Sequence, residues 1–361
     1  MIECIFVGDV MPGSRRVGEP WPEPIADWFG TADVVIGNLE CPIVSDRPRD
    51  VNKDKIPLWS TAENIGILQH FGFTHLNLNN NHTFDLYEEG LKETIHHLRD
   101  TDIEPFGIDW GGLYQVTTIE RDGIKVGLIT ANWVDRQFAR SLSRDLREFD
   151  IPGIRKSTDV LVCSIHWGDD HNIFVNRDQQ ETAHALIDQG VDLVIGHHPH
   201  VPQGYEIYKG KYIFYSLGNF IFTPKEEYDN LPYAVRFEDQ RENILFLRRE
   251  CKIGLVVKVR FVRGGGCSVE EVMPVFRAET LPAPVPDNLV AFRDTLMATM
   301  NDQVSRCDYG QNDAERKRIL SSYTLPLILS RPWYWPIFFK KVGLQKVLWF
   351  AKDRLSRQPV H

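Results

Sequence analysis

The sequence predicts a layered α/β fold with mixed β-sheets flanked by helices. Short runs rich in Val and Ile alternate along the chain with longer amphipathic stretches, which is typical of strands joined by crossover helices. One pair of runs, 115–120 and 125–129, is joined by a turn containing Asp122-Gly123, a sequence that favours the positive φ of a tight hairpin. Since a hairpin makes its two strands antiparallel, we expect mixed rather than purely parallel pairing.

The individual elements follow from these patterns in chain order. Each strand is predicted from a short β-branched run that ends in small or polar residues, and these runs occupy residues 2–7, 34–37, 75–78, 126–130, 160–165, 193–195 and 212–215. Amphipathic stretches predict helices over residues 62–71, 86–99 and 178–189. After Phe222 the pattern changes, and we expect strands at 245–249 and 255–262, a Pro-rich linker at 281–286 and helices at 288–300 and 313–322. We therefore divide the chain into a domain over residues 1–280 and a helical, aromatic and basic C-terminal extension over residues 281–361 that packs on it.

Composition and charge exclude some classes of protein. The formal net charge of −9 argues against a nucleic-acid partner, because phosphate backbones are held by clustered Lys and Arg. The six cysteines are scattered without a C-x-x-C pair, so we expect buried, reduced thiols. A strand pattern begins at Ile2 and leaves no room for a signal peptide, which predicts a cytoplasmic protein.

The segment 333–350 is both aromatic and basic, and it has two interpretations. Trp, Phe and Lys together favour a helix that docks on a membrane surface or a peptide. The simpler interpretation is a terminal helix whose aromatic side chains pack on the main domain, since large apolar side chains are commonly buried. No run in the sequence is long and apolar enough to predict a transmembrane helix.

Acidic, amide and imidazole side chains gather at the ends of the predicted strands. Ligands bind at the carboxyl edge of open α/β sheets, so we expect these side chains to converge there. The motif His197-His198-Pro199-His200 is the strongest signal, because three imidazoles after an apolar strand have no simple role in a core. Mixed oxygen and imidazole ligands suit Mn, Mg, Ca, Zn or Fe. We predict a divalent metal ion with the candidate ligands Asp9, Glu40, Asn81, His166, His198 and His200.

The order and spacing of these motifs resemble the CapA, or poly-γ-glutamate capsule, protein family. The shared motifs stand here as Gly8-Asp9-Val10-Met11, Gly37-Asn38-Leu39-Glu40, Asn80-Asn81-His82-Thr83-Phe84-Asp85, His166-Trp167-Gly168, Gly196-His197-His198-Pro199-His200 and Tyr215-Ser216-Leu217-Gly218-Asn219-Phe220. The resemblance covers about residues 3–222. It implies a calcineurin-like metallophosphoesterase fold, places the six candidate ligands on metal-ligand positions of that superfamily, and places His82 on its general-acid position.

Two departures from the pattern of conventional metallophosphatases stand out. Met11 occupies a position where those enzymes have His, and a thioether is a poor ligand for a hard cation. One of the two usual metal sites should therefore be weakened. Asp170 stands where relatives of the family commonly have Glu, and the shorter carboxylate could leave room for substrate or a bridging water.

The surplus imidazoles and carboxylates suggest acid/base chemistry. A carboxylate that orients an imidazole is a standard device for proton transfer. The candidate pairs are His82 with Asp85, and His197 or His171 with Asp169 or Asp170. The family's link to γ-polyglutamate implies a peptide or polyamide substrate, and relatives associated with peptide epimerisation suggest proton exchange at Cα, or else amide cleavage or transfer.

Two other functions stay open at this stage. One is phosphoester hydrolysis, for which the implied fold is the argument. The other is a non-catalytic scaffold of a capsule system that docks through the segment 333–350. Among neighbouring residues, we expect Trp167 to pack beneath the site, Asn219 to fix a loop, and Asn38 to orient Glu40.

Overall fold

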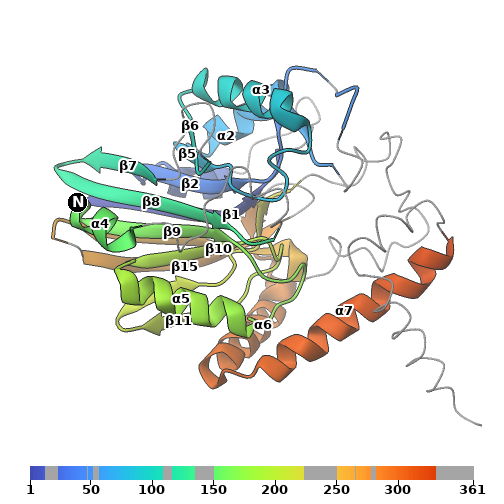
Figure 1. Cartoon of the computed structure of the whole chain (residues 1–361). Coiled ribbons are helices and arrows are strands. Elements are labelled where there is room, and N and C mark those ends of the chain that lie inside the picture. Colours follow the sequence, from blue (N-terminus) through green and yellow to red (C-terminus); the bar gives the residue numbers. More distant parts are fainter. Residues whose placement is uncertain are drawn as a thin grey trace, which may run out of the picture.

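The alternating apolar runs pair into two large β-sheets that pack face to face, with helices on their outer faces (Figure 1), and β3 and β4 form a small third sheet. The computed structural model describes residues 1–12, 23–46, 48–51, 57–108, 116–134, 150–222, 250–264, 266–277 and 282–330. Its strands are β1 (Ile2–Val10), β2 (Val34–Leu39), β3 (Ile43–Val44), β4 (Ser60–Thr61), β5 (His75–Asn77), β6 (Glu104–Phe106), β7 (Val116–Arg121), β8 (Ile124–Asn132), β9 (Val160–His166), β10 (Leu193–His197), β11 (Tyr205–Tyr208), β12 (Lys211–Phe214), β13 (Asn219–Ile221), β14 (Ile253–Val262), β15 (Gly266–Arg277) and β16 (Pro282–Pro284). Its helices are α1 (Glu23–Phe29), α2 (Gly66–His70), α3 (Tyr87–Arg99), α4 (Ile151–Lys156), α5 (Arg177–Gln189), α6 (Asp287–Arg306) and α7 (Tyr309–Ser330), with 3₁₀ turns η1 (Ala62–Ile65) and η6 (Glu250–Lys252).

Both large sheets contain parallel and antiparallel pairs. The first has the order β16-β15-β14-β1-β2-β5-β6, with β13 also paired to β1, and the second has the order β11-β12-β10-β9-β8-β7. β1 runs parallel to β2 but antiparallel to β14. In the second sheet β9 runs parallel to β8 and β10, whereas β7 and β8 form an antiparallel hairpin. The predicted layered α/β architecture with mixed sheets is confirmed.

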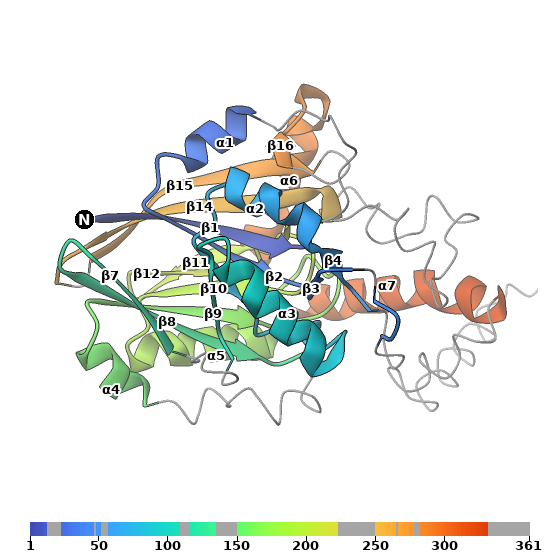
Figure 2. The same cartoon turned by 90° about the horizontal axis from the view of Figure 1, so that it is seen from above.

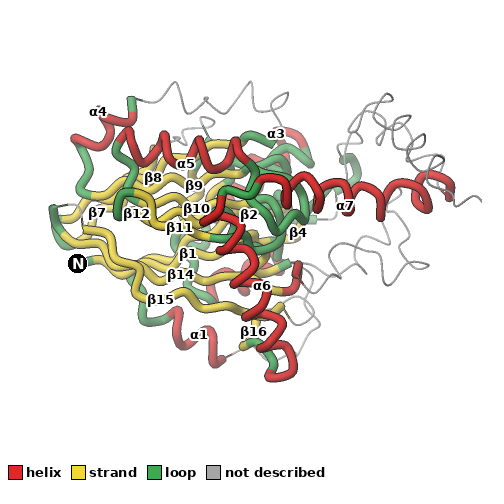
Figure 3. Tube along the Cα trace, turned by 90° about the horizontal axis from the view of Figure 1, so that it is seen from below, coloured by secondary structure: helices red, strands yellow, loops and turns green. Residues whose placement is uncertain are grey.

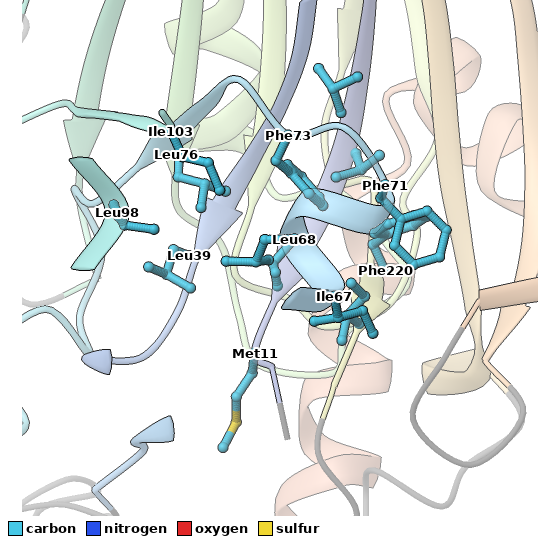
Figure 4. Packing of buried hydrophobic residues seen from close by; sticks show 14 of the residues in the cluster. Met11, Leu39, Ile67, Leu68, Phe71, Phe73, Leu76, Leu98, Ile103 and Phe220 are labelled. Carbon is cyan, nitrogen blue, oxygen red and sulfur yellow. The ribbon is translucent and has the colours of Figure 1, made fainter. Parts of the chain in front are cut away.

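Three large apolar clusters among the described residues hold the fold together, and β1 contributes to two of them. Cys4 and Phe6 belong to the core between the sheets, while Ile5 and Val7 face the outer core beneath α1, α2 and α3. This division follows from the period of two along a strand. Figure 4 shows part of the outer core, where the rings of Phe71 and Phe220 meet edge to face with centroids 5.2 Å apart. A third cluster joins the second sheet to α4 and α5, so each sheet is buried on both faces.

Several predicted strands extend further toward their carboxyl ends than the sequence suggested. The strand predicted to stop at Val7 continues to Val10, and the one predicted to stop at Ile195 continues to His197. Polar residues expected just past these strands therefore lie in their last positions, because pairing with neighbouring strands continues there. The β7–β8 hairpin is confirmed for the described residues: Asp122 and Gly123 form its turn with φ of 51° and 70°.

Two of the three helices predicted before residue 222 are confirmed, and the third is divided. Residues 86–99 and 178–189 correspond closely to α3 and α5, and α5 begins with a capping box formed by Asn176 and Gln179. The helix predicted over 62–71 is instead the turn η1 followed by the short helix α2. Gly66, which joins the two, is a poor helix former, and this agrees with the interruption.

Part of the segment predicted to be a linker belongs to the first sheet. Pro282–Pro284, predicted to be part of a linker, form the edge strand β16 against β15, a position in which missing proline N–H groups are tolerated. The predicted helices at 288–300 and 313–322 are confirmed as parts of α6 and α7. In Figures 2 and 3, α7 starts near the strand ends and runs outward. The strand predicted at 245–249 and the segment 333–350 lie outside the described residues. Among the helices that are described, none combines the length and apolar character needed to cross a bilayer.

The thiols are free, as expected, but not all of them are buried. Cys4, Cys41, Cys163 and Cys251 are buried, and Cys267 is partly buried. Cys307 is exposed, which corrects the prediction. It caps α6 in the left-handed conformation, with φ of 52°, where the chain turns at the surface toward α7.

Candidate metal centre

The core between the sheets becomes polar at the carboxyl ends of their strands. In β9 the inward positions run from Val162 to His166, and in β10 they run from Ile195 to His197. In β2 the same face continues from Ile36 through Asn38, and Glu40 follows just after the strand. Because side chains repeat every second residue along a strand, apolar and polar residues share one face. The packing that builds the core therefore also brings the polar side chains together.

Asp9 reaches this face through an irregularity in β1. The β1–β2 register shifts between Phe6 and Asp9, which turns Asp9 toward the other inward-facing residues. Gly8 makes this possible, because a Cβ there would lie 1.8 Å from the carbonyl oxygen of Gly218. The Nδ2 atom of Asn38 then donates a hydrogen bond of 2.9 Å to Oδ1 of Asp9. Asn38 thus orients Asp9 rather than Glu40, which corrects our expectation.

Glu40 lies at the centre of the cluster. Its Oε1 atom is 3.3 Å from Nε2 of His166, and its Oε2 atom is 3.4 Å from Nδ1 of His200. The same His200 nitrogen is 3.5 Å from Oδ2 of Asp9. These side chains are buried and come from both sheets, so the cluster spans the interface between the sheets.

The other two predicted ligands complete the group. Oδ1 of Asn81 lies 2.8 Å from Nε2 of His166, and Nε2 of His198 lies 3.0 Å from Oδ1 of Asp170. Three overlapping triads place one ligand atom from each residue within 4.8 Å of the others, and they are Glu40-His166-His198, Asp170-His198-His200 and Asp9-Glu40-His200. All six predicted ligands are therefore brought together, and Asp170, which we had assigned to acid/base chemistry, joins them.

A cation suits this donor set on energetic grounds. Neither carboxylate oxygen of Glu40 receives a hydrogen bond from the described residues, although the side chain is fully buried. Burial, and then the negative charges of Asp9, Asp170 and Asp85, raise the pKa of Glu40 well above its usual value. A buried carboxylate without donors is costly unless a positive charge compensates it. Coordination to a divalent ion would provide that charge.

The protonation states of His166 and His200 also suit metal coordination. Burial, and then neighbouring imidazoles, lower the pKa of His166 well below its usual value, so its ring is neutral at neutral pH. Burial likewise lowers the pKa of His200. A neutral imidazole keeps the lone pair that a metal needs. The Asp9 carboxylate favours its ionised form: burial opposes ionisation, but the interactions with His197 and His200 hold the pKa of Asp9 below its usual range.

The backbone around the His motif is strained in a way typical of functional sites. His198 and His200 both have positive φ, of 101° and 57°. Residues other than Gly rarely adopt this region, and such strain persists only where surrounding contacts enforce it. One such contact is Asn219, whose Oδ1 lies 3.0 Å from Nδ1 of His200 and whose Nδ2 donates to the His200 carbonyl. Asn219 therefore fixes the loop, as predicted, and orients a candidate ligand.

The predicted pair of His82 and Asp85 is present. Nδ1 of His82 is 2.6 Å from Oδ2 of Asp85, and that oxygen also accepts a hydrogen bond from the backbone N–H of Leu58. Asp85 is buried, whereas the His82 side chain is 13% exposed. Because its Nδ1 atom faces the carboxylate, Nε2 is the ring nitrogen that takes no part in this pair.

The second predicted pair, His197 or His171 with Asp169 or Asp170, has a different arrangement. His197 faces Asp9, with Nδ1 3.5 Å from Oδ1, because it shares the inward face of β10 with Ile195. Asp170 instead contacts His198, as described above. Asp169 lies 3.6 Å from Nε of Arg316. His197 is thus not the partner of either carboxylate.

Several neighbouring residues have supporting roles. His171 stacks on His200 with ring centroids 5.5 Å apart, and its Nδ1 atom lies 3.6 Å from Sγ of Cys251. Trp167 is buried and donates a hydrogen bond to the carbonyl of Tyr215, so it packs beneath the site as predicted. Met11 is buried in the apolar cluster drawn in part in Figure 4. The contacts of Asn38 with Asp9 and of Arg316 with Asp169 had no signal in the sequence, because they depend on packing between distant segments.

Comparison with solved structures finds distant similarities. One is a novel phosphatase from Mycoplasma pneumoniae, with 15% identity, a TM-score of 0.47, and coverage of 82% of this chain and 99% of that one. Another is a putative 5'-nucleotidase from Staphylococcus aureus, with 14% identity, a TM-score of 0.44, and coverage of 81% and 58%.

Comparison with curated sequences and families is more specific. The chain is 31% identical over 245 residues to the PGA biosynthesis protein CapA of Bacillus subtilis (strain 168), covering 62% of this chain and 63% of that protein. It is 30% identical over 243 residues to the capsule biosynthesis protein CapA of Bacillus anthracis, covering 60% and 59%. The chain thus spans about three fifths of the length of these relatives. The model of the family described as bacterial capsule synthesis protein PGA_cap matches residues 3–224, and this match confirms the resemblance. The matched range contains every candidate ligand. This chain belongs to the bacterial capsule synthesis protein family PGA_cap.

Proposed function

We propose that this chain is a metal-dependent enzyme that uses His/Asp acid/base chemistry on a peptide or polyamide. The observation that carries the proposal is the buried Glu40 carboxylate, which receives no hydrogen bond from the described residues and faces His166 and His200 within 3.4 Å. The substrate class is supported by the names of the relatives, which include PGA biosynthesis and, in Mycobacterium tuberculosis, a probable polyglutamine synthesis accessory protein.

The candidate ligands have distinct tasks in this proposal. Glu40, His166, His198 and His200 would hold the ion, with Asp9, Asn81 and Asp170 adjoining them. When bound there, a divalent ion supplies Lewis acidity toward a substrate carbonyl. Asn38 and Asn219 keep Asp9 and His200 in place before any ligand arrives.

Proton transfer is carried out by two partly exposed residues beside the candidate ligands, His82 and Asp170. His82 exchanges a proton through the ring nitrogen that does not face Asp85, while Asp85 orients the ring and stabilises its cation. Asp170, whose side chain is 50% exposed, belongs to the loop after β9 in the opposite sheet. In epimerisation, one of these groups removes the Cα proton and the other returns a proton to the opposite face. In amide hydrolysis, water adds to the carbonyl carbon and gives a proton to Asp170, and His82 donates the proton that the leaving nitrogen requires as the C–N bond breaks.

An isotope experiment tests the proposal. Candidate γ-linked and α-linked glutamyl peptides are incubated in heavy water with Mn²⁺-loaded protein, and mass spectrometry follows both deuterium at Cα and peptide cleavage. Epimerisation predicts one deuterium per altered residue without cleavage, whereas amide hydrolysis predicts fragments. Neither product should form with His82→Ala. If wild-type and variant proteins give the same peptide products, the proposed role of His82 is wrong.

Phosphoester hydrolysis is the second candidate, and one observation favours it. The three triads overlap through Glu40, His198 and His200, so they offer donors for more than one ion. Two ions together clamp the attacking and leaving oxygens in that chemistry. Met11 argues against a strong second site, since its side chain is buried in an apolar cluster. Metal-dependent release of phosphate from an aryl phosphate, lost in Asn81→Ala, would support this alternative.

A non-catalytic role in capsule assembly is the third candidate. It would keep the metal centre as a structural element, and docking would depend on the segment 333–350. Unchanged partner or vesicle binding by His82→Ala, together with no turnover of peptides or phosphates by the wild type, would support it.

A further inference from the structure

The loop that follows β9 is held by side chains of the C-terminal helices. Gln303 of α6 is buried, and its Oε1 accepts from the backbone N–H of Val175 while its Nε2 donates to the Val175 carbonyl. Nδ2 of Asn172 donates to the carbonyl of Asn312 on α7, and Nδ2 of Asn312 donates to the carbonyl of Phe174. Buried amide groups that satisfy one another in this way fix a single arrangement. The start of α7 is therefore held against this loop.

This docking brings an arginine beside Asp169, the residue that precedes Asp170 in the loop. Arg316 follows Asn312 by one helical turn, so both lie on the same face of α7. Its Nε atom is 3.6 Å from Oδ1 of Asp169. The next residue, Asp170, contacts His198, which belongs to two of the candidate metal triads. The guanidinium thus adjoins the loop that reaches the ligands, and its side chain is 52% exposed.

We propose that Arg316 binds an anionic group, a carboxylate or a phosphate, of the ligand held at the metal centre. The inference rests on the proposed function, because it requires that a metal and its ligand occupy the cluster. A guanidinium offers a planar fork of donors that matches both kinds of oxyanion, so it can retain an anion as well as attract one. Arg316 is then a specificity-determining residue contributed from outside the part of the chain that the family model matches.

The charges around the cluster explain why such a residue is needed. Asp9, Glu40, Asp169 and Asp170 place four carboxylates in and beside the centre. Without opposing charge, they would repel an anionic ligand. The ion pair between Arg316 and Asp169 is partly exposed, and exposed pairs stabilise proteins only weakly. Exchange of Asp169 for an anion of the ligand therefore costs little.

Binding measurements on the whole 361-residue chain test this assignment. Calorimetry first measures Mn²⁺ binding to metal-free protein, and then the binding of inorganic phosphate or of glutarate to the Mn²⁺-loaded protein. Arg316→Gln should weaken the binding of at least one anion by about tenfold or more, as expected for loss of a charge-assisted hydrogen bond. Arg316→Lys should weaken it less, and Mn²⁺ should bind all variants. Which anion responds identifies the group as a phosphate or a carboxylate.

Arg306→Gln is the matched control. It removes the same charge from the preceding helix, where Arg306 is 70% exposed and pairs with Asp302. The inference is overturned if Arg316→Gln binds both anions as tightly as the wild type, or if both glutamine variants weaken binding equally. It also falls if the wild type binds Mn²⁺ but neither anion. Failure of the wild type to bind Mn²⁺ would be a different result, since that would remove the proposed metal centre itself.

Discussion

Oε2 of Glu40 and Nδ1 of His200 lie 3.4 Å apart, with both side chains buried. Because this pair belongs to the candidate centre, Mn²⁺ should stabilise the wild-type protein, by about 2.7 kcal/mol at a concentration one hundred times the dissociation constant. Glu40→Gln should abolish most of that gain. Thermal unfolding with Mn²⁺ and with EDTA measures the effect. The exposed Glu88 of α3 supplies the control Glu88→Gln, which should respond to Mn²⁺ as the wild type does.

Glu40→Gln should have a second effect in the metal-free protein. The raised pKa of Glu40 means that the native state binds a proton more tightly than the unfolded chain does. The free energy of unfolding therefore falls as pH rises and Glu40 loses this proton. Glu40→Gln should therefore be at least as stable as the wild type at pH 8 in EDTA, despite its failure to gain from Mn²⁺. A variant that is much less stable in EDTA would instead indicate a structural role for Glu40.

Much of the fold could be predicted because the inner strands are buried on both faces. Such strands form continuous apolar runs, and β9 and β10 were found from sequence at nearly their observed positions. Short edge strands were missed, because pairing with neighbours defines them more than their composition does. β6 contains Pro105 and β16 contains Pro282, and proline in a run usually argues against a strand.

The site was predictable to the extent that it follows the strands. Asp9, Glu40 and His166 occupy the carboxyl ends of apolar runs, so their convergence could be inferred from the amino-acid sequence. Their partners could not be inferred in the same way. The contact of Asp170 with His198 depends on the path of a loop, and the contact of Asp169 with Arg316 depends on how α7 docks.

His82 and Asp85 should affect turnover without affecting metal binding. His82→Ala removes the proposed proton carrier, and a positioned acid or base contributes about 10²- to 10⁴-fold to the rate. Asp85→Asn keeps the shape of the pair but removes the charge that stabilises a protonated His82. We expect both variants to lose peptide turnover in the deuterium assay while calorimetry shows normal Mn²⁺ binding. Loss of Mn²⁺ binding in His82→Ala would place His82 among the ligands instead.

Gln303 should couple the C-terminal helices to the metal centre. Gln303→Leu leaves the backbone N–H of Val175 without its buried acceptor, which costs about 1–3 kcal/mol of stability. We also expect weaker Mn²⁺ binding, because the loop that carries Asp170 loses its support. Gln189→Leu on the exposed end of α5 is the control, since it removes an amide of the same size. Equal Mn²⁺ affinities in the two variants would contradict the proposed coupling.

His75 should make the protein less stable in acid, independently of the metal centre. Burial lowers its pKa from 6.5 to about 4. Above pH 6.5 the ring is neutral in both states, whereas between pH 6.5 and 4 the unfolded chain takes up a proton that the native state refuses, so stability falls as pH falls. The loss from this residue is at most about 3 kcal/mol. Urea unfolding at pH 7 and pH 4.5 in EDTA should show a smaller acid loss for His75→Phe than for the wild type. The exposed His96 gives the control His96→Gln, and an equal acid loss in His75→Phe and the wild type would show that His75 does not cause this sensitivity.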